Sequence, residues 1–516
     1  MTAKTRERGD PMLISELVKT DAFELISGSG DIDIDSVEFD SRACKPGSLF
    51  VAIKGFNSDG HEYIGSAAAK GVSAVLIDSS RDKERYGIDD ILKTLGPDTA
   101  VIETRDTRKA LGIVSAEVYD HPERKLDIAG ITGTKGKTTI TFMLRSILDC
   151  AGISSGLVGT VRNIAGGKII KSEHTTPESS DLYRMMRDME ASGDKALVME
   201  VSSQGLKFDR AYGVRYKVAA FTNLYEDHIA PTEHPDMEDY FASKLKIFDN
   251  CQTGIINGDS SYAADAAEYA SGKCDVLFYG TDGNVDIKAS GIRHFSEGCD
   301  SGSVFELASP WYQGEIKINL PGKFNVSNAL CAIACAGVMG IPFDSVREGL
   351  AKARVPGRMQ PVANDLGISV IVDYAHNAAA LENVLLTVRE YTDKRIICVF
   401  GCGGNRSRTR RFEMGEVSGR MADLTVITSD NPRNEDPLAI IEDIVTGIEP
   451  TGGVYETEPD RARAIKHAMS IANPGDVVII AGKGHEDYQI FANRTIHFDD
   501  GEAASAAAAE IKEERQ

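Results

Sequence analysis

The sequence predicts an α/β protein with three domains. Short apolar runs alternate with amphipathic stretches of helical period along most of the chain, which favours parallel sheets covered by helices. A length of 516 residues with 42% hydrophobic side chains suits about three domains, each with its own core. A glycine-rich segment begins soon after residue 125, and a proline–glycine hinge lies at Pro356 to Arg358. We therefore expect domains over residues 1–125, 126–355 and 356–516.

The first 125 residues are expected to form a small α/β domain, with apolar strands at Leu49 to Ile53 and Ala74 to Ile77. Two of its loops carry candidate ligand-binding residues, which are Asp40, Ser41 and Arg42 in one loop, and Asn57 and His61 in the other. Solvated loops explain such residues as well as ligand contacts do, although loops at strand ends commonly carry binding groups. Both interpretations stay open on these residues alone.

The central domain opens with a glycine-rich turn, GITGTKGKTT at residues 130–139, between a predicted strand and a predicted helix. Gly133 and Gly136 allow backbone N–H groups to approach a polyphosphate, and the helix start favours negative charge. Lys137 adds a point charge, and Thr138 can ligate Mg²⁺. We therefore predict a phosphate-binding loop in a P-loop ATPase-like domain with a mostly parallel sheet. The alternative is a glycine-rich turn with an incidental lysine.

Acidic and imidazole side chains follow two further strands of the central domain. Glu200 lies at the end of one apolar strand, and Asp227 and His228 follow the next. Carboxylates and a nitrogen ligand beside nucleotide phosphates suit Mg²⁺. Taken singly, Glu200 could cap a helix and His228 could be a surface histidine, but their place at neighbouring strand ends favours a metal site.

Residues 356–516 repeat the alternation of strands and helices and predict a Rossmann-like α/β domain. Asp373 and His376 follow its first buried strand. Its later loops carry five arginines, which are Arg406, Arg408, Arg410, Arg411 and Arg433. Arginine forks bind carboxylates and phosphates bidentately, so we favour an anion site over a solvated basic loop. Together, the three domains suit activation of a carboxylate by phosphoryl transfer, followed by attack of an amine.

The amino-acid composition limits the classes of partner that the protein is expected to bind. A formal net charge of −21 argues against nucleic acid or an anionic membrane surface as the main partner. Nine scattered cysteines show no CxxC spacing and are expected to be reduced thiols. The polar start lacks a secretory signal, and no apolar run is long enough to span a bilayer. We therefore expect a cytoplasmic protein that neither binds nucleic acid nor inserts into membranes, and we favour a monomer.

A dozen motifs in order make the chain similar to the Mur ligase family, and within it to the MurE type, the UDP-N-acetylmuramoyl-tripeptide synthetases. The motifs are DSR at 40–42, GTKGKTT at 133–139, VGT at 158–160, TTPE at 175–178, MEVSS at 199–203, FTNLYEDH at 221–228, GKFNVSN at 322–328, PGRM at 356–359, DYAH at 373–376, FGCGG at 400–404, SDNPR at 429–433 and AGKGHE at 481–486. The resemblance implies that the three domains bind a UDP-linked substrate, ATP and an amino acid in that order. It also implies the reaction, in which ATP phosphorylates the free carboxylate of UDP-MurNAc-L-Ala-D-Glu and the amine of a third residue attacks the acyl phosphate.

The resemblance also implies roles for individual residues. The residues implied in catalysis are Lys137, Glu200, His228 and Lys244. The implied Mg²⁺ ligands are Thr138, Glu200, His228 and, if carbamylated on its amine, Lys244. The implied ATP contacts are Gly133, Thr134, Lys135, Gly136, Lys137, Thr138, Thr139, Asn325, Arg358 and Asp373. The implied contacts to the UDP-MurNAc-dipeptide are Ser41, Thr175, Thr176, Ser202 and Arg210, and those to the amino acid are Asp430, Asn431, Arg433, Gly482 and Glu486.

Arg433 favours meso-diaminopimelate as the amino acid, since lysine-adding relatives resemble this stretch but lack the arginine. The chain departs from the family pattern at several places. The loop between His228 and Lys244 is about two residues longer, Gln204 replaces a histidine, Phe208 replaces a glutamine and Asn405 replaces an aspartate. Two alternatives therefore stay open. One is a lysine-adding or polyglutamate-type ligase acting on a related acidic peptide, and the other is a nucleotide-switched binding protein without catalysis, against which the retained catalytic residues argue.

Overall fold

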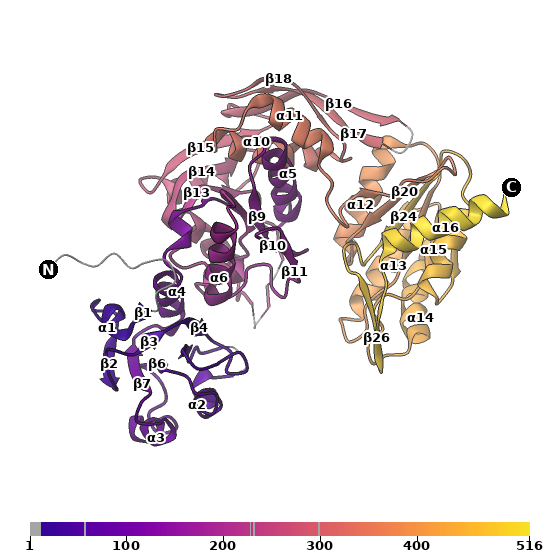
Figure 1. Ribbon diagram of the computed structural model, residues 1–516. Helices are drawn as coiled ribbons and strands as arrows, with labels where there is room; N and C mark the ends of the chain where they lie inside the picture. The colour runs from indigo at the N-terminus through magenta and orange to yellow at the C-terminus, as the bar shows by residue number, and fades with distance from the viewer. Residues whose placement is uncertain (1–11, 56–57, 228, 231–232, 298–299, 516) are drawn as a thin grey trace. The chain divides into compact units, whose positions relative to one another are not determined.

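The computed structural model of the protein describes residues 12–55, 58–227, 229–230, 233–297 and 300–515 (Figure 1). The chain forms two compact units. Unit 1 comprises Met1–Thr141, Ala151–Tyr279 and Ala334–Ile341, and unit 2 comprises Phe142–Cys150, Gly280–Ile333 and Pro342–Gln516. Strands alternate with helices in both units, which confirms the predicted α/β class. The domain boundaries near residues 125 and 355 stay a prediction.

Unit 1 begins with a small sheet of strand order β2-β7-β6-β5-β4. Strands β4 to β7 pair in parallel, whereas β2 runs antiparallel to β7. The predicted apolar runs form β5 and β6. The elements of this region are β1 (Met12–Leu13), α1 (Ile14–Leu17), β2 (Glu24–Ser27), β3 (Asp33–Ile34), β4 (Ser36–Glu38), β5 (Ser48–Val51), α2 (Ile64–Ala68), β6 (Ala74–Asp78), α3 (Ile88–Thr94), β7 (Ala100–Thr104) and α4 (Thr107–Val118).

The central sheet of unit 1 has the order β11-β10-β9-β12-β8-β13-β14-β15, with parallel pairing from β9 through β15. Its elements are β8 (Asp127–Thr132), α5 (Lys137–Cys150), β9 (Ser155–Val158), β10 (Asn163–Ala165), β11 (Lys168–Ile170), α6 (Ser179–Ala191), β12 (Ala196–Glu200), α7 (Ser203–Lys207), β13 (Tyr216–Phe221), α8 (Met237–Leu245), β14 (Cys251–Asn257), α9 (Ala263–Ala270) and β15 (Asp275–Gly280). The register aligns Glu200 with Ile131 and Phe221 with Thr132. The segments that follow β8, β12 and β13 therefore meet at one edge of the sheet, where such sheets bind ligands.

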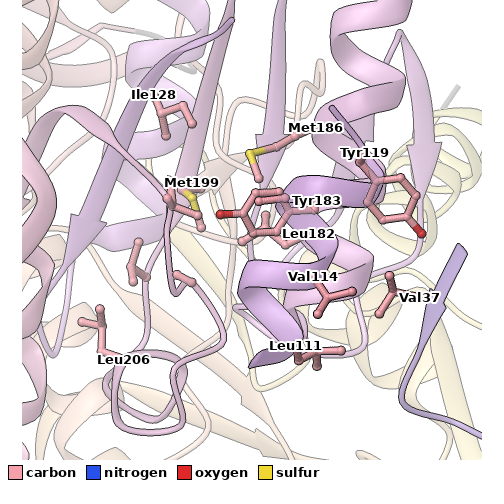
Figure 2. Packing of buried hydrophobic residues seen from close by; sticks show 14 of the residues in the cluster. Val37, Leu111, Val114, Tyr119, Ile128, Leu182, Tyr183, Met186, Met199 and Leu206 are labelled. Atoms are coloured by element: carbon pink, nitrogen blue, oxygen red, sulfur yellow. The ribbon is translucent and has the colours of Figure 1, made fainter. Parts of the chain in front are cut away.

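One hydrophobic core continues from the N-terminal sheet into the central sheet of unit 1 (Figure 2). Val37 of β4 and Leu111 and Val114 of α4 belong to the same buried cluster as Leu182 and Met186 of α6. Burial of such side chains is the main favourable contribution to folding. This shared core holds α4 against α6, so the start of α4 has a defined place beside the central sheet.

Unit 2 contains an antiparallel segment and a second, mostly parallel sheet. Strands β16 to β18 pair antiparallel. The second sheet has the order β19-β20-β24-β21-β22-β23, with parallel pairing from β20 through β23, in agreement with the predicted Rossmann-like domain. The chain ends in a helix, α16 (Asp500–Glu514), which buries Ala504, Ala507 and Ile511.

The elements of this region are β16 (Ile287–Glu297), β17 (Asp300–Ala308), β18 (Gln313–Ile318), α10 (Lys323–Val338), α11 (Phe343–Lys352), β19 (Gln360–Pro361), β20 (Ser369–Asp373), α12 (Ala378–Tyr391), β21 (Ile396–Phe400), α13 (Thr409–Met421), β22 (Leu424–Ile427), α14 (Pro437–Ile448), β23 (Tyr455–Thr457), α15 (Arg461–Ser470), β24 (Val477–Ala481), β25 (Tyr488–Phe491), β26 (Arg494–His497) and α16 (Asp500–Glu514). Among the helices of the described residues, none combines the length and the apolar character needed to span a bilayer.

Candidate active site

The predicted phosphate-binding loop connects β8 to α5 and depends on glycine. Gly133 and Gly136 have φ values of 143° and 93°, in the region that favours glycine. A Cβ on Gly133 would lie 1.9 Å from Oγ1 of Thr222. Asn223 ties the loop to the end of β13, because its backbone oxygen accepts from the N–H of Thr134 at 3.0 Å. Contacts with the end of β13 therefore fix the position of the loop.

Two lysines of this loop have different partners. The Nζ of Lys137, at the first position of α5, donates to the backbone oxygens of Gly133 at 2.8 Å and Thr134 at 3.2 Å. Lys135 is exposed and forms an ion pair with Asp227 at 3.1 Å. Asp227, one of the carboxylates considered for a metal, thus pairs with a lysine of the loop.

Glu200 is buried at the end of β12 beside the first turn of α5. Its carboxylate accepts hydrogen bonds from the hydroxyl of Thr138 at 2.9 Å and from the N–H of Thr160 at 2.9 Å. Thr139 is buried in the same turn. Thr138 and Glu200 bring together oxygen atoms of the kind that Mg²⁺ prefers. His228 lies outside the described residues, and the rest of the described chain contains no group of three His, Cys, Asp or Glu side chains placed to hold a metal.

Lys244 reaches the same loop from α8 with only 1% of its surface exposed. Its Nζ donates to the backbone oxygen of Gly133 at 2.9 Å and lies 4.4 Å from the ring centroid of Tyr240. Burial, reinforced by the charge of Lys137, lowers the pKa of Lys244 well below its usual range. Burial thus shifts Lys244 toward the neutral amine relative to an exposed lysine.

A row of hydroxyl groups continues from Glu200. Thr160 and Thr175 share a hydrogen bond of 2.9 Å between their hydroxyls. The hydroxyl of Thr176 donates to the backbone oxygen of Glu200 at 3.1 Å and lies 3.2 Å from the hydroxyl of Ser202. The structure thus brings Thr175, Thr176 and Ser202 together beside Glu200.

Arg210 lies at the far end of this row, where it meets a buried carboxylate. Its Nε donates to Glu178 at 2.9 Å, and its Nη1 donates to the backbone oxygen of Thr176 at 3.3 Å. Glu178 also accepts from Nη1 of Arg108, in the first turn of α4, at 3.2 Å. Neither Glu178 nor Arg108 was among the predicted site residues. Glu178 stands inside the TTPE motif, but no motif signals Arg108.

Ser41 is buried in the turn after β4, and its neighbours Asp40 and Arg42 pair with each other at 2.6 Å. The ring of His61 is buried in the N-terminal sheet region. Its Nδ1 lies 2.6 Å from the carboxylate of Asp59, and its Nε2 accepts a hydrogen bond from the backbone N–H of Asp78 at 3.1 Å. His61 therefore has a structural role, and Asn57 lies outside the described residues.

The predicted nucleotide contacts of unit 2 lie at the start of α10 and around the end of β20. Asn325 is buried, and its Nδ2 donates to the backbone oxygen of Pro321 at 2.7 Å. The guanidinium of Arg358 lies 4.6 Å from the ring centroid of Tyr374. Burial raises the pKa of Asp373, and the nearby charge of Arg358 opposes that rise.

Unit 2 places a buried lysine between two residues predicted to bind the amino acid. Nδ2 of Asn431 donates to the carboxylate of Glu486 at 2.8 Å. The Nζ of Lys483 lies 3.3 Å from both Oδ1 of Asn431 and Oε2 of Glu486, and this side chain is fully buried. Burial raises the pKa of Glu486, and the charge of Lys483 opposes that rise. Lys483 was not predicted as a site residue, although it stands within the GKGHE motif.

Arg433 and Gly482 occupy backbone conformations that constrain their loops. Arg433 has a φ of 53°, and its Nη1 donates to the backbone oxygen of Gly404 at 2.9 Å. Gly482 has a φ of 115°, and a Cβ there would lie 2.9 Å from Oδ2 of the buried Asp430. These residues and Asn431 follow β22 and β24 of one sheet.

The prediction of a single anion site made of five arginines is too broad. Arg411 is buried and pairs with Glu435 at 2.8 Å and with Asp443 at 2.9 Å. Arg408 also pairs with Asp443. Two of the five guanidiniums are therefore already paired with carboxylates that are distant in sequence. These ion pairs connect the start of α13 to the segment 435–443.

Three family models match the chain in order. They are Mur ligase family, catalytic domain, over residues 33–119, Mur ligase middle domain over residues 131–336, and Mur ligase, glutamate ligase domain over residues 357–484.

Curated relatives and a solved structure match over nearly the whole length. A UDP-N-acetylmuramoyl-L-alanyl-D-glutamate–2,6-diaminopimelate ligase of Clostridium botulinum is 43% identical over 93% of this chain and 96% of its own. The ligase of the same name from Clostridium perfringens is 40% identical over 95% of this chain and 98% of its own. A solved structure with that ligase name has a TM-score of 0.69 and 27% identity, covering 98% of this chain and all of that one. By its sequence and its fold, the chain belongs to the Mur ligase family.

Proposed function

We propose that the protein is an ATP-dependent amide ligase that adds meso-diaminopimelate to UDP-MurNAc-L-Ala-D-Glu. One observation carries the assignment of the site, namely the hydrogen-bonded row Thr138, Glu200, Thr160 and Thr175 that leads from the phosphate-binding loop to the hydroxyls near Arg210. ATP transfers its terminal phosphoryl group to the free carboxylate of the dipeptide, forming ADP and an acyl phosphate. The amine of the incoming residue then attacks the carbonyl carbon, the C–N bond forms, and phosphate leaves.

The phosphate end of the site uses the loop at residues 133–139. Backbone N–H groups at the start of α5 and the ammonium group of Lys137 bind phosphate oxygens. Thr138 and Glu200, with His228, are the proposed ligands of Mg²⁺, which neutralises phosphate charge when bound. In unit 2, we assign Asn325, Arg358 and Asp373 to the adenine nucleotide by their resemblance to the family.

Lys244 is the proposed site of carbamylation. Carbamylation requires a neutral amine, whose nitrogen attacks carbon dioxide, forms an N–C bond and loses a proton to give a carbamate anion. Burial without a carboxylate partner among the described residues, and the neighbouring Lys137, both favour that neutral form. The resulting anion would supply oxygen atoms that could hold a second Mg²⁺.

By resemblance to the family, the uridine nucleotide of the UDP-linked substrate is assigned to Ser41, and its muramoyl peptide to Thr175, Thr176, Ser202 and Arg210. The amino acid is assigned to the loops after β22 and β24 in unit 2. Arg433 suits the extra carboxylate of diaminopimelate, and Glu486 suits an ammonium group. Asp430, Asn431 and Gly482 complete these loops.

The experiment is a substrate panel. The purified protein is incubated with ATP, Mg²⁺, UDP-MurNAc-L-Ala-D-Glu and one of meso-diaminopimelate, L-lysine or L-glutamate, and both ADP release and the ligated product are measured. We expect turnover that depends on diaminopimelate. Faster turnover with lysine or glutamate would support the alternative, a lysine-adding or polyglutamate-type ligase. The sequence features that favour this alternative are the longer loop after His228 and the replacements at Gln204 and Phe208. ATP binding without turnover on any substrate would support the nucleotide-switched binding protein.

We further propose that the protein acts as a monomer in the cytoplasm, where ATP and UDP-linked precursors are available. The net charge of −21 supports small-molecule substrates rather than nucleic acid or a membrane surface. Light scattering at the concentration of the activity assay tests the oligomeric state.

A further inference from the structure

We infer that Arg108 is a further substrate-binding residue, which binds, together with Arg210, the carboxylate of the dipeptide's terminal glutamate that is not phosphorylated. This inference rests on the proposed function, because it concerns the same UDP-linked substrate. Terminal glutamate has two carboxylates, so one of them remains as an anion while the other reacts. A ligase for this substrate therefore needs a cationic group away from the phosphates.

The fold brings Arg108 to the row of hydroxyls from outside the central sheet. Asp106 caps α4, and its carboxylate accepts from the N–H groups of Arg108 and Lys109, each at 3.1 Å. The shared core of unit 1 packs α4 against α6, whose N-cap is Glu178. The guanidinium of Arg108 consequently meets Glu178, 70 residues away in the sequence.

The charges at this point leave an excess of one positive charge. Two guanidiniums, of Arg108 and Arg210, share the single carboxylate of Glu178. The next carboxyl groups, of Asp209 and Asp106, are balanced by the lysines Lys246 and Lys109, and the charge of Arg108 acts on Asp209 more weakly than either lysine. Both arginine side chains keep less than a fifth of their surface exposed, at 19% and 16%. A partly desolvated excess cation of this kind favours an anionic ligand.

Unused donors point to the same ligand. Arg108 donates to Glu178 only through Nη1, at 3.2 and 3.4 Å, and Arg210 uses Nε and Nη1. Within the part of the chain that the structure describes, the remaining guanidinium N–H groups of Arg108 and Arg210 have no acceptor. A planar guanidinium binds a carboxylate with two parallel hydrogen bonds, so these donors suit a second carboxylate.

Phe208 contacts the guanidinium of Arg108 and is a departure of this chain from the family pattern. The guanidinium carbon of Arg108 lies 5.3 Å from the ring centroid of Phe208, within the range of a cation–π contact. Phe208 stands where members of the family, by resemblance, have a glutamine. An aromatic ring that positions a guanidinium thus replaces an amide that could bond the substrate itself.

The test measures how Arg108→Ala changes the use of two substrates, UDP-MurNAc-L-Ala-D-Glu and its analogue with the non-reacting carboxylate amidated. Loss of a charge-assisted contact predicts a KM for the natural substrate that is raised roughly 10- to 100-fold, with unchanged KM for ATP and for diaminopimelate. We expect the wild-type preference for carboxylate over amide to fall toward one in Arg108→Ala and to be partly kept in Arg108→Lys. Arg187→Ala is the matched control, since that guanidinium lies 5.1 Å from the ring centroid of Tyr119 and pairs with Asp188 on the surface.

Three results would overturn the inference. One is an unchanged carboxylate-to-amide preference in a folded Arg108→Ala protein. Another is that Arg108→Ala and Arg108→Lys both lose thermal stability and both lose activity equally on the two substrates. That result would show that Arg108 stabilises the fold rather than binding the substrate. The third is a wild-type protein that is inactive with the natural dipeptide substrate, which would refute the proposed function as well, whereas the first two leave that function standing.

Discussion

Unit 1 and unit 2 each bury a lysine in a predicted site, and the two lysines have opposite surroundings. Among the described residues, the Nζ of Lys244 donates to a backbone oxygen, and the charge of Lys137 acts on it more strongly than the carboxylate of Asp227 does. Lys483 lies 3.3 Å from the carboxylate of Glu486. Within the described part of the chain, Lys483 therefore has an ion-pair partner and Lys244 does not.

The difference shows how one residue type serves two kinds of chemistry. Burial without an ion-pair partner favours the neutral amine, which is the nucleophilic form that the proposed carbamylation of Lys244 requires. A buried ammonium paired with a carboxylate instead fixes the position of its partners. We interpret Lys483 as a positioning residue that holds Asn431 and Glu486 for the amino acid.

The largest expected effect is the loss of activity in Lys244→Ala. Removing the amine removes the proposed carbamate, so we expect turnover to fall roughly 1,000-fold, the scale seen when one preorganised electrostatic group is lost. Added formate supplies a small carboxylate and should restore part of the activity. ADP release is the measurement, and the exposed neighbour Lys246→Ala is the control. Full activity of Lys244→Ala would remove the distinction between the two lysines.

The stabilities of variants at the two lysines test the contrast directly. Lys483→Met leaves the half-buried carboxylate of Glu486 without its cation, and we expect it to lower the free energy of unfolding by about 3 kcal/mol. Lys244→Met removes a buried amine that has no ion-pair partner among the described residues, so stability should be unchanged or higher. Urea denaturation followed by fluorescence and circular dichroism measures both. The double variant Lys483→Met/Glu486→Gln should recover part of the loss, and equal destabilisation by Lys244→Met and Lys483→Met would contradict the comparison.

The next effect tests the amino-acid loops next to Lys483. In Arg433→Asn the new side chain tolerates the left-handed backbone, so the change removes the guanidinium without straining the loop. We expect the KM for diaminopimelate to rise roughly 30-fold, because one charge-assisted contact is lost, while the KM for ATP stays the same. Steady-state kinetics measure both constants, with the exposed Arg420→Ala as control. A rise confined to the KM for ATP would refute the assignment.

The smallest effect is a pH dependence that belongs to Lys244. Its pKa is lowered in the folded state, so below the ordinary lysine value of 10.5 the unfolded chain takes up a proton that the folded chain does not. Wild type should therefore lose stability relative to Lys244→Met as the pH falls below 10.5. We expect the Tm difference between them to grow by roughly 1–2 °C per pH unit in buffer free of carbon dioxide. A difference that does not change with pH would show that Lys244 stays charged.

Much of the fold and part of the candidate site follow from local pattern. The glycine turn between β8 and α5 is visible because strand and helix periods flank it, and Glu200 is visible as an acid at the end of an apolar run. The motif at residues 429–433 points to Arg433 in the same way. By contrast, Arg408 and Arg411 were predicted to bind an anion, because their partners Glu435 and Asp443 are over 20 residues away and no periodic pattern connects them.

The sequence by itself determined the order of strands and helices, the phosphate-binding turn and the family, because each depends on residues close together in the chain. Only the tertiary structure decided which charges are paired. Lys244 and Lys483 are residues of the same type, and their difference comes from a carboxylate that packing brings into contact with Lys483, whereas no described carboxylate contacts Lys244. Arg108 likewise joins Arg210 only because a shared core holds α4 against α6. Burial and electrostatic environment are set by groups that are distant in sequence, and these decide the chemistry of a side chain.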